Sequence, residues 1–266
     1  MTWWLLCYVA LGLGSGFIAG LFGVGGGLTI VPILLMLFKA QGFPEAELMH
    51  LALGTAMATI VVTSISSMRA HHQHGGVRWD IFRGMAPGLV TGTLVGSLFA
   101  SGVQTDYLAM AFTAIVYWAS LQMLLDFKPK PTRQLPGFAG LLGTGGVIGG
   151  VSSLVAAGGG FLSVPFMVLC NVPIRQAVGT SAALGFPIAA AGVIGYIVGG
   201  WSQTDLPGPH LGFVYLPAFF GVVVSTVFMA PVGARVAHRL PVKQLKRAFG
   251  LMLALLASKM LWNLWG

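Results

Sequence analysis

Two glycine segments are the residues whose spacing is best suited to chemistry. In each, three consecutive glycines are followed, after four further residues, by a proline. Glycine accepts a positive φ angle and lets another group approach the backbone closely. A helix that begins at such a turn points unpaired N–H groups and the positive end of its dipole forward, which suits an anion. The segments are Gly25, Gly26, Gly27 with Pro32, and Gly158, Gly159, Gly160 with Pro165.

Hydroxyl side chains near these glycines would complete two half-sites for a small anion, because a hydroxyl group donates a hydrogen bond without carrying charge. The candidates are Thr29, Thr55, Ser163, Thr180 and Ser181. The alternative is that each hydroxyl bonds its own helix and that the glycines only allow tight packing. His50 and Arg175 stand shortly before the Gly54-Thr55 and Gly179-Thr180 pairs. They either attract or gate an anion or simply lie at the membrane interface.

The elements that must position these groups are membrane helices. The chain has 266 residues, of which 56% are hydrophobic and 8% are charged, and a soluble domain of this size does not have that composition. The uncharged runs 1–38 and 134–174 are 38 and 41 residues long, whereas one crossing needs about 20. Each run therefore predicts a hairpin: a full helix, a glycine turn, and a helix of about 12 to 14 residues that starts inside the membrane. Non-helical backbone at that depth must be buried in protein or line a wet cavity.

The sequence repeats this plan, which predicts an all-α polytopic fold of two repeats. The triple glycines match at an offset of 133, the Gly-Thr pairs at 125, and Pro87 matches Pro217 at 130. Each hairpin is followed by three spanning segments, so residues 1–126 form the first repeat, 127–137 a cytoplasmic linker and 138–266 the second repeat. The spanning segments are 51–68, 84–105, 107–125, 177–204, 211–234 and 248–265.

Basic residues predict that the two repeats are inverted. Eleven of the fourteen Lys and Arg residues fall in the loops 69–83, 128–133 and 235–247. Short cytoplasmic loops collect such residues. If these loops are cytoplasmic, equivalent segments cross in opposite directions and both termini lie outside. Inverted repeats with interrupted helices are the architecture of secondary transporters, whose sites lie where the broken helices meet.

Other classes of function fit the sequence less well. The glycine-rich segments lack the lysine of a nucleotide loop, and the spans contain no HExxH motif, carboxylate pair or Ser-His pair. The two cysteines, Cys7 and Cys170, are far apart, and the cluster His71, His72, His74 lies in a basic loop where solvation is expected rather than a metal. We therefore expect no enzyme activity, no cofactor or metal, and no nucleic-acid partner. A homodimer is expected from the glycine-rich surfaces, and a non-transporting membrane anchor stays open as an alternative.

The same residues resemble the TauE/SafE family of sulfite exporters. The resemblance rests on the glycine pattern from Gly16 to Gly27 with Pro32, on the segment from Gly158 to Pro165, and on the openings at Ala52 and Ala177. It covers essentially the whole chain. It implies a multi-pass permease of the bacterial cytoplasmic membrane that moves sulfite, organosulfonates or related small sulfur-containing anions.

The function expected from the sequence is export of such an anion by alternating access, coupled to the proton gradient or the membrane potential. The glycines and hydroxyls named above would bind the anion. The alternative is an uptake carrier or channel-like pore for another small anion, such as sulfate, thiosulfate or a carboxylate.

Overall fold

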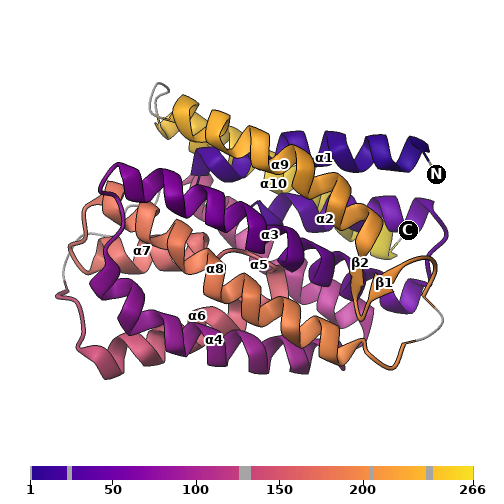
Figure 1. The fold of residues 1–266 in the computed structure, drawn as a ribbon, viewed down its shortest axis with the longest axis horizontal. Coiled ribbons are helices and arrows are strands. Elements are labelled where there is room, and N and C mark those ends of the chain that lie inside the picture. Colours follow the sequence, from indigo (N-terminus) through magenta and orange to yellow (C-terminus); the bar gives the residue numbers. More distant parts are fainter. Residues whose placement is uncertain (1, 23–25, 126–132, 204–205, 238–241, 266) are drawn as a thin grey trace.

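The computed structural model describes residues 2–22, 26–125, 133–203, 206–237 and 242–265, and these are almost entirely helical (Figure 1). The first half contains α1 (Thr2–Phe22), α2 (Gly27–Ala40), the single 3-10 turn η1 (Glu45–Glu47), α3 (Leu48–Gln73), α4 (Trp79–Ser101) and α5 (Thr105–Leu124). The second half contains α6 (Phe138–Val155), α7 (Gly160–Leu169), α8 (Ile174–Gly199), a small hairpin of β1 (His210–Leu211) and β2 (Val214–Tyr215), α9 (Leu216–Ala237) and α10 (Val242–Trp265).

The predicted all-α polytopic fold is confirmed. Among the described residues, seven helices are long and apolar enough to cross a membrane, namely α1, α3, α4, α5, α6, α8 and α9. The expected last span is also a helix, α10, which is 24 residues long. It is less apolar because it carries Lys243, Lys246, Arg247 and Lys259. It packs on α5, where the Ser120 hydroxyl donates to the Gly250 carbonyl at 2.7 Å.

The two interrupted helices are present where the glycines predict them. Both α2 and α7 begin directly after a glycine, Gly26 or Gly159, with φ 75° and ψ −9°. An L side chain rarely adopts this left-handed conformation, so glycine is required at both turns. The helix α2 has 14 residues, as expected, but α7 has only 10.

Two helix pairs pack through matching glycines. Gly12 of α1 lies against Val222 of α9, and Gly145 of α6 lies against Met85 of α4. Small residues allow such close backbone approach between membrane helices. The offset between α4 and α9 in these contacts is 137, not 130, so the expected match of Pro87 with Pro217 is wrong. Pro87 lies nine residues into α4, whereas Pro217 is the second residue of α9.

The two halves run in opposite directions. Along the contact between α3 and α8, Gly192 faces Met57 while Gly185 faces Ser64, so these corresponding helices are antiparallel. Both chain ends lie at one end of the bundle, near the β hairpin (Figure 1). These relations support the predicted inverted repeats, and the exact repeat boundaries stay a prediction.

The bundle has two chemically different ends. At the end that we call the basic end, the α3–α4 loop meets the start of α8, where Gly76 lies near the Arg175 carbonyl. Arg133 joins this end because its N–H donates to the Leu169 carbonyl at 3.2 Å. Residues 127–132 of the predicted linker lie outside the described part of the chain. We call the opposite end, which carries η1 and the β hairpin, the hairpin end.

The predicted span 211–234 begins before the observed helix α9, which starts at Leu216. Residues 211–215 were expected to be helical, but they complete the β hairpin, in which His210 pairs with Tyr215. Gly208 and Gly212 have φ angles of 75° and 54°, and Gly212 approaches the Ile197 carbonyl closely. Glycine at these turns reverses the chain before α9 begins at Leu216.

Candidate functional site

The two glycine turns meet in the interior of the bundle. A Cβ atom added to Gly27 would overlap the carbonyl of Ala156, the residue that ends α6 in the left-handed conformation. The start of α2 therefore touches the turn that leads into α7. Gly158 and Gly160 belong to this second turn, whereas Gly25 lies outside the described residues. The sequence predicted this meeting of the two half-helices.

Hydroxyl groups within the turns bind their own helices. The Gly26 carbonyl accepts hydrogen bonds from the Thr29 N–H at 3.0 Å and the Thr29 hydroxyl at 2.7 Å. The Gly159 carbonyl accepts from the N–H and the hydroxyl of Ser163, both at 2.8 Å. The Ser163 and Ser181 hydroxyl oxygens lie 3.0 Å apart and join α7 to α8. In these contacts the hydroxyls stabilise the protein itself, which is the alternative to anion binding that the sequence left open.

The two Gly-Thr pairs anchor loops at opposite ends of the bundle. Thr55 accepts a hydrogen bond from the Tyr215 N–H at 3.0 Å, and Thr180 accepts one from the Arg78 N–H at 2.8 Å. The glycine before each threonine allows the same loop to approach, because a Cβ there would overlap the Phe213 or Gly76 carbonyl. The geometry thus gives both threonines a structural role at the starts of α9 and α4.

Replacing Thr180 with valine is expected to destabilise the protein by about 1–3 kcal/mol, because the part-buried Arg78 N–H loses its acceptor. Thermal unfolding in detergent micelles would measure the change. Thr144→Val is the matched control, since the Thr144 hydroxyl is exposed and bonds only its own helix. Equal unfolding temperatures for the two variants would contradict the anchoring role.

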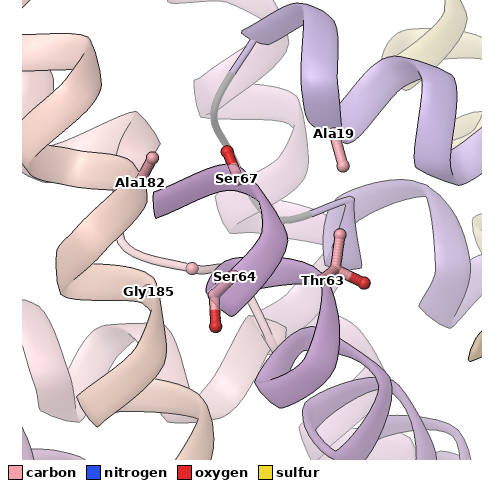
Figure 2. A pocket seen from close by; sticks show the side chains of 7 residues that line it. Ala19, Thr63, Ser64, Ser67, Ala182 and Gly185 are labelled. Atoms are coloured by element: carbon pink, nitrogen blue, oxygen red, sulfur yellow. The ribbon is translucent and has the colours of Figure 1, made fainter. Parts of the chain in front are cut away.

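A small cavity lies beside the meeting point of the turns. Figure 2 shows Ser64 and Ser67 of α3 facing Ala182 and Gly185 of α8, with Ala19 of α1 on the far side. The space open to the centre of a water molecule is about 10 Å³, which is room for about one water. A ligand with several oxygens therefore requires α3 and α8 to move apart. The described residues that line the cavity are Ala19, Thr63, Ser64, Ser67, Gly158, Ala182 and Gly185.

The cavity's polar groups come from one turn of α3. The hydroxyls of Thr63 and Ser64 donate to their own helix, to the Thr59 carbonyl at 2.9 Å and the Val61 carbonyl at 3.0 Å. Ser67 is only 9% exposed, and its hydroxyl has no hydrogen-bond partner among the described residues. A buried hydroxyl without a partner is unfavourable unless a ligand or water binds it. Ser67 is thus the side chain best prepared to bind a ligand.

The sequence did not lead us to predict that this turn of α3 lines the cavity. Of the described residues that were predicted to bind substrate, Gly158 is the one that lines the cavity. The signal was available, because Thr63, Ser64, Ser66 and Ser67 place four hydroxyls within five positions of an uncharged span. Their importance depends on which helix they face, and the neighbouring α8 supplies only small residues at Ala182 and Gly185.

The electrostatics of the cavity favour an anion, because the groups around it donate hydrogen bonds and no carboxylate among the described lining residues would repel the anion. No Asp, Glu, Lys, Arg or His is among the described residues that line it. The N-termini of α2 and α7 adjoin the meeting point, and each carries unpaired N–H groups and a partial positive charge. Neutral donors and helix termini are the groups that can bind a small anion here.

His50 and Arg175 lie at opposite ends of the bundle, and neither lines the cavity. At the hairpin end, His50 Nε2 is 2.9 Å from the Val103 carbonyl and 3.2 Å from the Ala100 carbonyl. Its Nδ1 lies 3.4 Å from the Glu47 carboxylate, and its ring stacks on Phe213. His50 therefore joins the ends of α3 and α4 to the hairpin, while Arg175 lies in the first turn of α8 at the basic end.

Comparison with known proteins agrees with this architecture. The family model described as sulfite exporter TauE/SafE matches residues 8–260. A probable membrane transporter protein of Haemophilus influenzae is 38% identical over 97% of this chain and 98% of its own length. The probable membrane transporter protein YdhB of Bacillus subtilis is 28% identical over 88% of this chain and 90% of its own length. No solved structure matches this chain significantly. The chain therefore belongs to the TauE/SafE family of membrane transporters.

Proposed function

We propose that this protein is a secondary transporter that exports sulfite or a related small sulfur-containing anion across the bacterial cytoplasmic membrane by alternating access. The family description supports the substrate class. The observation that carries the proposal is the interior cavity, which is lined by hydroxyls and glycine and lies where two half-helices begin. Such a site binds an anion through neutral donors, as described above.

The architecture also supports alternating access. The cavity lies between α3 and α8, the antiparallel pair at the interface of the two halves. Movement of one half against the other would open the cavity first to the basic end and then to the hairpin end, as in other inverted-repeat transporters. The small size of the cavity corresponds to a closed arrangement of these helices.

The membrane potential is a sufficient driving force in this proposal. The interior of a bacterium is negative, so an anion that leaves moves down the electrical gradient. The gain is about 2.3 kcal/mol per charge for each 100 mV. No titratable side chain lines the described cavity to carry a coupled proton, which favours the potential over the proton gradient as the energy source.

Flux of radiolabelled sulfite in proteoliposomes tests the proposal. We expect saturable movement that increases when a potassium diffusion potential makes the starting compartment negative. A pH gradient of equal size, applied without a potential and with the starting compartment kept at the same pH, should have a smaller effect. Empty liposomes and liposomes with an unrelated membrane protein are the controls.

Other outcomes of the flux measurement would change the proposal. Flux that does not saturate, without counterflow of preloaded sulfite, would indicate a channel-like pore. Faster flux for sulfate or thiosulfate than for sulfite would change the substrate. No flux of any of these anions would reject the proposal. The homodimer expected from the sequence stays a prediction, which the mass of the purified protein in detergent would test.

A further inference from the structure

Both halves of the pseudosymmetric fold line the cavity, but its polar side chains come from the first half. The Gly-Thr pairs set the correspondence of α3 with α8, at an offset of 125. At this offset the cavity residues Thr63, Ser64 and Ser67 correspond to Ile188, Ala189 and Gly192.

The symmetry-related space between the same two helices is filled by apolar side chains. A Cβ on Gly159 would lie 2.6 Å from Ile188, one on Gly192 would lie 2.9 Å from Met57, and one on Gly27 would lie 2.9 Å from Ile60. Met57, Ile60 and Ile188 are all fully buried. In the described part of the chain, the polar cavity therefore has no polar counterpart at the symmetry-related position, and an apolar layer separates it from the hairpin end.

Ionisable groups on the surrounding elements do not line the cavity, although some lie close to it in the chain. On α3, His50 is in the first turn, whereas Arg69, His71 and His72 follow Ser67 within the last two turns, and Arg69 and His72 are exposed. On α8, Arg175 is in the first turn, and Tyr196 is near the other end with its hydroxyl donating to the Ser153 carbonyl at 3.0 Å. The sequence has no Asp, Glu, Lys, Arg or His in 1–38, 51–68 or 134–174, the segments that contribute α1, this part of α3 and the α6–α7 turn.

A cavity lined by neutral groups selects between anions by their charge. The idealised cost of moving an ion from water into a low-dielectric interior rises with the square of its charge, so a dianion costs about four times as much as a monoanion. A neighbouring Lys or Arg would offset that cost, but none lines the described cavity. Hydroxyls and helix N-termini offer partial charges only.

We infer that this cavity binds singly charged oxyanions, and that Ser67 donates a hydrogen bond to them. Sulfite can exist as the dianion or as the hydrogen sulfite monoanion, and it exchanges its single proton near neutral pH. The species bound and exported is then hydrogen sulfite. Sulfate, which stays a dianion at these pH values, is rejected by its charge. This inference rests on the proposed function, because it specifies the ionic form of the proposed substrate.

Chlorate is the decisive probe for this inference. It has the same pyramidal shape and number of electrons as the sulfite dianion, but it carries one charge and does not take up a proton at these pH values. Competition with radiolabelled sulfite binding to the purified protein in detergent would measure its affinity. We expect chlorate to compete equally well at about pH 6 and about pH 8, while the apparent affinity for total sulfite falls with the hydrogen sulfite fraction as the pH rises.

Two results would overturn the inference. The first is failure of chlorate to compete where sulfite binds, and the second is sulfite affinity that stays constant or increases as the pH rises. Chlorate also controls for titration of the protein, because its own affinity would then change with pH. A parallel change for both ions would show that a protein group is responsible and would equally reject the inference.

The serine variants test the binding residue. Ser67→Ala is expected to weaken chlorate and sulfite binding about tenfold, because a donor to a charged ligand is lost. Ser66→Ala is the matched control, since Ser66 is the adjacent hydroxyl and does not line the cavity. Equal affinities of the two variants would reject the role of Ser67. Ser67→Cys, which keeps a weak donor, should fall between the alanine variant and the unchanged protein.

The same measurements separate this inference from the proposed function. Sulfite flux and binding without the expected pH dependence would reject the choice of the monoanion and leave the exporter proposal intact. Absence of sulfite binding and flux at every pH, together with chlorate binding that is measured directly by calorimetry and depends on Ser67, would reject sulfite as substrate and keep the monoanion site.

Discussion

Gly27→Ala is expected to reduce sulfite flux at least tenfold and to destabilise the protein by about 1–3 kcal/mol, the range typical of overpacked interiors. The added Cβ would overlap the Ala156 carbonyl, and the nearest side-chain atom, Cδ1 of Ile60, would lie 2.9 Å away. Backbone cannot rotate out of the way as a side chain can. The two glycine turns would therefore separate, and the cavity beside them would change shape. Flux in proteoliposomes and thermal unfolding in detergent would measure both effects.

Gly14→Ala is the matched control for this variant. Gly14 also lies in a helix of the first hairpin, but it is exposed and a Cβ there meets nothing within 4 Å. Alanine favours helix over glycine, so this variant should keep its flux and be slightly more stable. If Gly27→Ala transports as well as Gly14→Ala, the meeting of the turns is unimportant for transport.

An impermeant maleimide is expected to label Glu45→Cys in intact cells and to leave Gln73→Cys unlabelled. Glu45 lies in η1 at the hairpin end, and Gln73 ends α3 at the basic end. Both are exposed, so either would react if the reagent reached it. Since basic residues favour the cytoplasmic side, the hairpin end should face outward. Both variants would be made in a chain whose Cys7 and Cys170 are replaced by serine.

Permeabilised cells provide the control for this labelling. There, both engineered cysteines should react, which shows that Gln73→Cys is accessible from the inside. Labelling of Gln73→Cys but not Glu45→Cys in intact cells would reverse the orientation of the whole bundle. Labelling of both in intact cells would contradict the arrangement in which these two residues lie at opposite ends.

The length and pattern of the uncharged runs determined much of the fold. A run such as 1–38 cannot be one crossing, and its glycines fall where a turn is needed, so the interrupted helices followed from the sequence. The left-handed φ of Gly26 and Gly159 is the conformation that only glycine adopts readily. Hydropathy and the glycine motif were likewise sufficient for the family.

Local structure that depends on contacts between distant residues was not predictable in the same way. The β hairpin before α9 was expected to be helix, because Leu211 to Tyr215 is apolar and continues into a helical pattern. It is held by distant partners instead, including Thr55, which accepts the Tyr215 N–H. A sequence pattern reports period and composition, but it does not show where a backbone N–H finds its acceptor.

The sequence alone determined that this is a helical membrane protein with two glycine turns and a neutral interior, because a charge or a glycine has a large effect wherever it is placed in a membrane. Only the tertiary structure decided which hydroxyls are available to a ligand. Thr29, Thr55, Ser163 and Thr180 bond the protein itself, whereas Ser67 faces small residues of α8, and its hydroxyl in the cavity has no partner among the described residues. The reason is that a hydroxyl can form a hydrogen bond with its own helix, with a neighbouring loop or with a ligand. Which partner it bonds depends on the groups that tertiary packing places within hydrogen-bond distance.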